Sequence, residues 1–116
     1  MVLGFDDSEL LKRWEMLIEY MHPHRDKFPK TQRHRMVAKI ESEHYAIHSM
    51  LVESNVRWRR AVRSDILKEV DVKLKIYTFS LRLAHKAEYL KTKQWEQASK
   101  IIVEFGRMLG SQINKK

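Results

Sequence analysis

The residues best suited to chemistry in this chain are a glutamate and two histidines near its middle. Glu41 and His44 have the Glu-x-x-His spacing, and His48 lies one helical turn further along the same face. Di-iron bundle enzymes bind their metals with two facing motifs of this kind and two further inward carboxylates. A mononuclear site built from these three residues is one alternative, and an ordinary solvated helix face is the favoured one. We therefore expect no metal.

Other catalytic patterns give little support for an enzyme. The sequence has no cysteine, which excludes disulfides, thiolate metal ligands and cysteine nucleophiles. No serine lies in a strand-turn-helix elbow, and no glycine-rich phosphate loop occurs. The segment from Gly106 to Gly110 resembles a nucleotide-binding fingerprint only superficially, because no strand precedes it. We expect a protein that is not an enzyme, with no catalytic residues and no cofactor.

Lysine and arginine dominate the charge of the chain. They number 23 against 15 aspartates and glutamates, which gives a formal net charge of +8. In a single small domain, such an excess makes nucleic acid the first partner to consider and an anionic membrane surface the second. Acidic residues among the first twenty argue against a signal peptide, and no apolar run reaches membrane-spanning length. We expect a soluble, cytoplasmic protein with no membrane partner.

The segment from Ile66 to Leu90 runs about seven helical turns without Gly or Pro and carries three stripes. One apolar stripe, suited to the core, comprises Leu67, Val70, Leu74, Tyr77, Leu81 and Ala84. A second apolar stripe, on the nearly opposite face, comprises Val72, Ile76, Phe79, Leu83 and Leu90. A basic seam between the two comprises Lys68, Lys75, Arg82 and Lys86.

The two extra stripes suggest two kinds of partner. The basic seam is long enough to follow a phosphate backbone without reading sequence, and an arginine cluster just before it extends the track. This cluster comprises Arg57, Arg59, Arg60 and Arg63. For Trp58, anchoring the entry to the helix is favoured over stacking on a base. An exposed row of Val72, Ile76, Phe79 and Leu83 predicts a homo-oligomer interface, in a closed ring or a dimer.

Sparse prolines and glycines divide the chain into four helices, at about 7–27, 32–55, 60–90 and 93–113. A capping box at Asp6 and Glu9 is expected to start the first, and Thr31 and Thr92 to cap the second and fourth. Short connections predict one domain, residues 1–116, folded as an all-α antiparallel up-down four-helix bundle. Gly106 and Gly110 within the last helix indicate close approach of another backbone; the alternative for Gly110 is fraying of the helix end.

Residues 103–113, with a Gly-Arg-x-Leu-Gly core, resemble the last-helix signature of the accessory variability determinant (Avd) proteins of diversity-generating retroelements. These belong with the bundle proteins encoded in intervening sequences of bacterial 23S ribosomal RNA genes. The likeness extends to residues 20–23, to the turn at 28–33 and to residues 71–83, where Arg82 matches a family arginine. Gln112 departs from the usual tryptophan, and Thr78 stands where Avd can show another arginine.

The resemblance implies a four-helix bundle that assembles as a pentameric ring and carries a basic surface. It implies sequence-independent phosphate contacts with RNA or cDNA and association with the retroelement reverse transcriptase, as a non-enzymatic accessory protein of mutagenic retrohoming. The alternative is a structural four-helix bundle of the ribosomal RNA intervening-sequence type, with no reverse transcriptase partner. Arg107 stays open between a structural ion pair and a contact with a partner.

Overall fold

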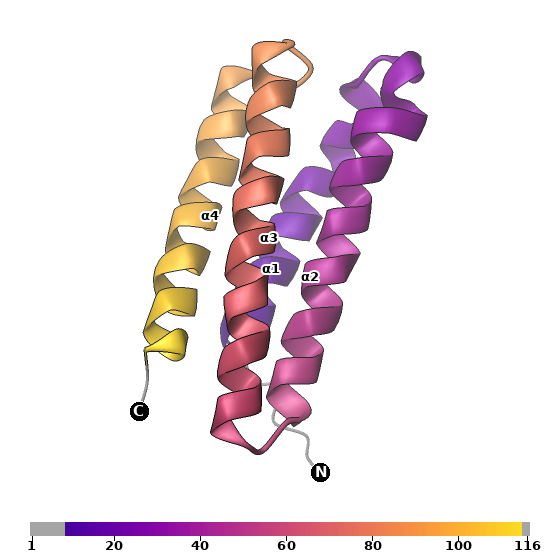
Figure 1. The fold of residues 1–116 in the computed structure, drawn as a ribbon. Coiled ribbons are helices and arrows are strands. Elements are labelled where there is room, and N and C mark those ends of the chain that lie inside the picture. The colour runs from indigo at the N-terminus through magenta and orange to yellow at the C-terminus, as the bar shows by residue number, and fades with distance from the viewer. Residues whose placement is uncertain (1–8, 115–116) are drawn as a thin grey trace.

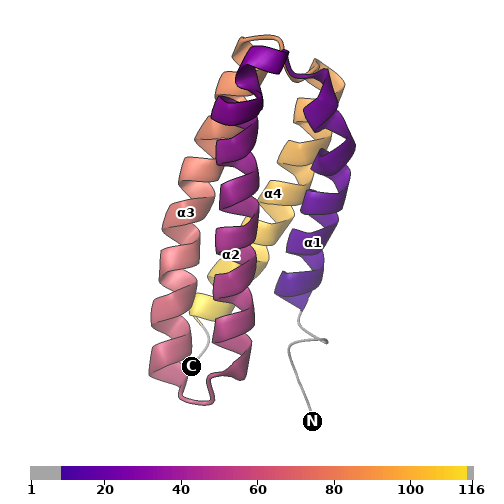
Figure 2. The ribbon, with the colours of Figure 1, turned by 90° about the vertical axis from the view of Figure 1, so that its right-hand side faces the viewer.

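The computed structural model describes residues 9–114, and this part of the chain is helical without any strand. Its four α-helices are α1 (Glu9–Met21), α2 (Ala38–Val56), α3 (Arg60–Lys86) and α4 (Thr92–Ile113). They run alternately up and down in a rod of 44 × 23 × 20 Å, with α1 and α3 each beside α2 and α4 (Figures 1 and 2). The predicted all-α bundle is confirmed. None of the described helices has the length and apolarity needed to cross a membrane.

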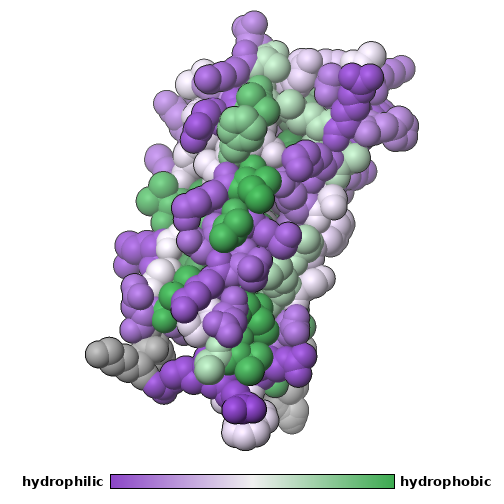
Figure 3. Space-filling model, in the orientation of Figure 1, coloured by the Kyte–Doolittle hydropathy of each residue, from purple (hydrophilic) through white to green (hydrophobic). Residues whose placement is uncertain are grey.

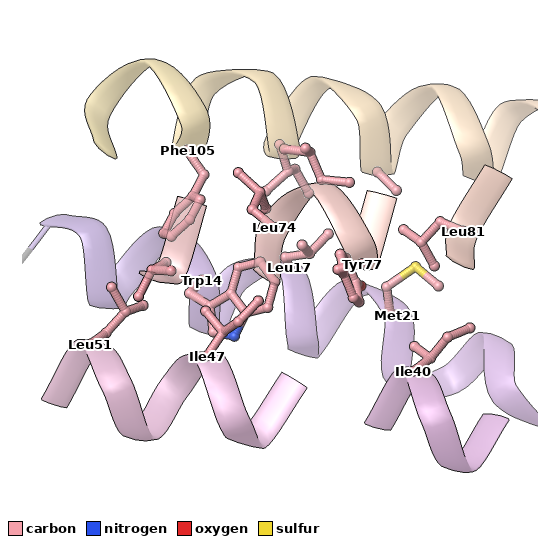
Figure 4. Packing of buried hydrophobic residues seen from close by; sticks show 14 of the residues in the cluster. Trp14, Leu17, Met21, Ile40, Ile47, Leu51, Leu74, Tyr77, Leu81 and Phe105 are labelled. Carbon is pink, nitrogen blue, oxygen red and sulfur yellow. The ribbon is translucent and has the colours of Figure 1, made fainter. Parts of the chain in front are cut away.

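The centre of the core holds one ring from each helix: Trp14, His44, Tyr77 and Phe105. Trp14 packs against Tyr77 and Phe105 with centroid separations of 5.2 Å each, and its indole N–H donates to the His44 carbonyl at 2.9 Å. Three of these rings point into the space between the helices in Figure 4. Every member of the predicted core stripe on α3 is buried. These rings belong to a continuous core of buried hydrophobic side chains from all four helices, and burial of that core is the main driving force for folding.

The connection between α1 and α2 differs from the prediction. Residues 22–27, predicted as the end of the first helix, form a 3₁₀ helix that contains Pro23. A 3₁₀ turn at 30–32 and a π turn at 33–37 then lead into α2, so Thr31 lies inside a turn and the predicted N-cap there is wrong. The residue that precedes the 3₁₀ turn at 30–32 is Pro29. The predicted capping box depends on Asp6, which lies outside the described residues.

The turn between α3 and α4 is built on a left-handed residue. Glu88 has φ of 66°, and the N–H groups of Glu88 and Tyr89 donate to the carbonyls of His85 and Ala84 at 3.0 and 2.9 Å. This is the Schellman pattern that closes a helix end, with glutamate where glycine is usual. The helix therefore ends at Lys86. The predicted end at residue 90 is wrong.

Two further expectations near this turn are corrected. Leu90 is buried under the turn, so its predicted place on the outer apolar stripe is wrong. Lys91, and not Thr92, is the N-cap of α4, and its N–H donates to Oε1 of Gln94 at 2.9 Å.

The glycines of α4 do not bring two backbones together. A Cβ at Gly106 would meet only a Leu74 methyl carbon at 3.7 Å, an ordinary contact, and a Cβ at Gly110 would meet nothing within 4 Å. The predicted close approach is therefore wrong. Arg107 between them forms an ion pair with Glu104, whose shortest N–O distance is 2.6 Å. Within residues 9–114, Arg107 therefore takes part in a local ion pair on the surface.

Candidate nucleic-acid interface

The basic seam of α3 lies on the surface, where all four side chains are exposed. Lys68 and Lys86 are eighteen residues apart, a rise of about 27 Å along the helix. Lys75 is paired with Asp71 at 2.7 Å, one turn earlier. The other three cations form no ion pair within residues 9–114, and their side chains are exposed to solvent. In place of a further arginine, Thr78 turns its hydroxyl back onto the Leu74 carbonyl at 2.8 Å.

The second apolar stripe is also exposed, apart from Leu90. Val72, Ile76, Phe79 and Leu83 are each 40–53% exposed. Figure 3 shows a hydrophobic band along α3 on the face turned to the viewer. The band borders a groove between α3 and the beginning of α2. The opposite wall of the groove is formed by Lys39 of α2 and by Gln32, Arg35 and Met36 of the turns that precede α2. Apart from Leu90, sequence periodicity therefore placed the members of both outer stripes correctly on the surface.

The arginine cluster surrounds the short loop between α2 and α3. Arg57 is paired with Glu53 at 3.0 Å, whereas Arg59, Arg60 and Arg63 have no ion pair in the described part of the chain. Arg60 and Arg63 also line a polar depression between the start of α3 and Gln112 near the end of α4.

The electrostatics of this end of the bundle are unusual. α3 begins at Arg60 with no acidic residue in its first turn and no side-chain cap. The positive end of a helix macrodipole is ordinarily stabilised by an anionic side chain, and adding cations there is unfavourable. The free N–H groups of the first turn and the arginines therefore produce one concentrated positive potential, which an external anion would relieve.

The sequence favoured a role for Trp58 as an anchor for the start of the helix. The structure shows that Trp58 does not anchor it. Its side chain is 88% exposed, more than any other large hydrophobic residue between positions 9 and 114. It makes no ring contact or hydrogen bond within residues 9–114. The residues on both sides are arginines.

The three candidate metal ligands diverge. Glu41 accepts a hydrogen bond from Arg25 at 2.9 Å, and His48 contacts Glu15 at 3.1 Å. His44 points into the core, where its Nε2 and the Tyr77 hydroxyl share a hydrogen bond of 2.7 Å. No group of three metal-ligating side chains converges in the described residues. The solvated-face interpretation is wrong for His44.

Burial sets the protonation states of this central pair. Desolvation lowers the pKa of His44 from 6.5 to about 4, partly opposed by the charge of Glu41. Burial likewise raises the pKa of Tyr77 well above its ordinary value. Both groups are neutral near pH 7, which suits an apolar core. The sequence held a signal for this role, because His44 shares a helix face with Ile40, Ile47 and Leu51.

A comparison with curated proteins found no match for the chain. A family model described as bAvd-like matches residues 9–116, nearly the whole sequence. The match agrees with the all-helical bundle and with the resemblance of the last helix to Avd proteins, and it supports a role as an accessory protein of a diversity-generating retroelement. The chain belongs to the bAvd-like family.

Proposed function

We propose that this protein is a non-enzymatic, homo-oligomeric accessory protein that binds RNA or cDNA and associates with a retroelement reverse transcriptase. The observation that carries the proposal is the outer face of α3, where the basic seam lies beside an exposed apolar stripe. Family membership supports the retroelement context. The seam supports phosphate binding, because its cations lie in a row and three lack local partners.

The basic seam is tested by the salt dependence of binding. Removing one cation that binds a phosphate should reduce the slope of log affinity against log salt by roughly one. Raising the salt from about 50 to about 200 mM weakens binding of both proteins. For a Lys75→Ala/Arg82→Ala/Lys86→Ala variant, the fold-loss of affinity should be roughly 15 to 60 times smaller than for the wild type. The matched control replaces Lys27, Lys30 and Lys100, three exposed cations that are not part of the seam. Equal slopes in the two triple variants would remove the seam from the interface.

The apolar stripe is tested by the mass in solution. We expect the wild type to form a closed oligomer, a pentamer by the family resemblance, since a row of half-exposed apolar side chains favours association. Phe79→Asp should lower the mass measured by light scattering and leave the helical circular dichroism unchanged. Val103→Asp, at an exposed apolar position on α4, is the control. A monomeric wild type would refute the oligomer.

The reverse transcriptase partner is tested separately. A reverse transcriptase gene and a template repeat should lie beside the gene for this protein, and the two proteins should copurify when expressed together. An isolated gene whose product does not copurify with the enzyme would favour the alternative, a structural bundle of the ribosomal RNA intervening-sequence type.

A further inference from the structure

We propose that Trp58 is a base-stacking residue, and that the loop between α2 and α3 binds nucleic acid with unpaired bases. The inference rests on the proposed nucleic-acid function and specifies its ligand. It starts from the indole, which is 88% exposed on a three-residue connection. An indole in water gains nothing from its large apolar face, so its position favours a role in binding.

The groups around Trp58 fit a phosphate-bearing ligand. Arg59, Arg60 and Arg63 are free of ion pairs within the described residues, and Arg60 and Arg63 line the depression beside Gln112. The uncapped start of α3 adds backbone N–H donors to the same region. All the cations here are arginines, whose planar forks bind phosphate through two hydrogen bonds at once.

The exposed indole of Trp58 favours an unpaired strand over a duplex. Bases inside a duplex are already stacked on both faces, whereas an unpaired base has a free face for the indole. Arg60 also lies two turns before Lys68 on α3, so the loop adjoins the basic seam. A strand whose base stacks on Trp58 would then continue along the seam through its phosphates.

The test compares two probes on the full chain: a single-stranded oligoribonucleotide without self-complementarity, and the same sequence as a duplex. Trp58→Ala should weaken binding of the single strand by roughly 5- to 150-fold, the range for loss of one stacked base. Its affinity for the duplex and its salt slope should stay within error of the wild type. Trp58→Phe should keep most of the single-strand affinity. Tyr45→Ala, at another exposed aromatic residue, is the matched control.

A second measurement follows the indole directly. The fluorescence difference between wild type and Trp58→Phe reports Trp58 alone, since Trp14 and Trp95 are common to both. If a base stacks on the ring, adding oligo(dT) should quench the fluorescence that this difference assigns to Trp58.

The outcomes separate this inference from the proposed function. If the wild type binds neither probe, the proposed function fails. If it binds both and Trp58→Ala weakens neither, or both equally, the stacking role fails while nucleic-acid binding stands. Loss of binding to phosphatidylcholine–phosphatidylserine vesicles in Trp58→Ala, with RNA affinity unchanged, would instead assign the loop to a membrane surface and overturn the inference.

Discussion

Lowering the pH should destabilise the bundle through His44. Its imidazole lies in the core, where burial lowers its pKa from 6.5 to about 4. In the unfolded chain the group returns to about 6.5. Between these values the unfolded chain binds a proton that the folded chain does not, so acid favours unfolding. This contribution to stability is fully present above pH 6.5 and is lost as the pH falls towards 4.

The size of the effect follows from the two pKa values. A shift from 6.5 to about 4 is worth about 3 kcal/mol in all, at about 1.4 kcal/mol per unit. Between about pH 8 and pH 5, the free energy of unfolding should fall by about 2 kcal/mol from this group alone. His24 acts in the same direction, because partial burial and then Lys27 lower its pKa.

Urea unfolding of the wild type and of His44→Gln, followed by circular dichroism at fixed protein concentration, isolates the contribution of His44. Glutamine does not titrate and can keep a hydrogen bond to Tyr77, and His24 and the carboxylates are common to both proteins. Between about pH 8 and pH 5, the free energy of unfolding of the variant should fall by about 2 kcal/mol less than that of the wild type. Parallel curves would refute the buried neutral imidazole. Should the variant not fold, an NMR titration of wild-type His44 with a midpoint near 6.5 would refute it equally.

Three further substitutions test the packing. Glu88→Gly should stabilise the protein by about 0.5–1 kcal/mol and raise Tm by a few degrees, because glycine adopts positive φ without a steric penalty; an unchanged or lower Tm would contradict this interpretation of the turn. Gly106→Ala should raise the free energy of unfolding in urea by up to about 1 kcal/mol, since the added methyl makes only an ordinary contact with Leu74; a loss of stability would show a tighter site. Tyr77→Phe should cost about 1–3 kcal/mol in the same assay by leaving His44 without its partner, and a negligible cost would argue against the buried hydrogen bond.

Much of the candidate interface could be predicted from the sequence because it lies on one long helix. Within α3, the angle between residues fixes which of them share a face, so Lys68, Arg82 and Phe79 could be placed on the surface before any tertiary contact was known. Trp58 could not be placed in this way. It lies in a connection without helical periodicity, and only the path of the loop shows that its side chain points away from the bundle.

The sequence by itself determined the four helices and the buried and exposed faces of α3, because helical periodicity is a local property of the chain. Tertiary structure alone decided the contacts between residues distant in sequence. His44 is a core residue because Tyr77, thirty-three residues later, meets its Nε2 across the bundle. Gly106 faces a Leu74 side chain and not a backbone. Such outcomes depend on how neighbouring helices are rotated and spaced, which no single stripe of residues encodes.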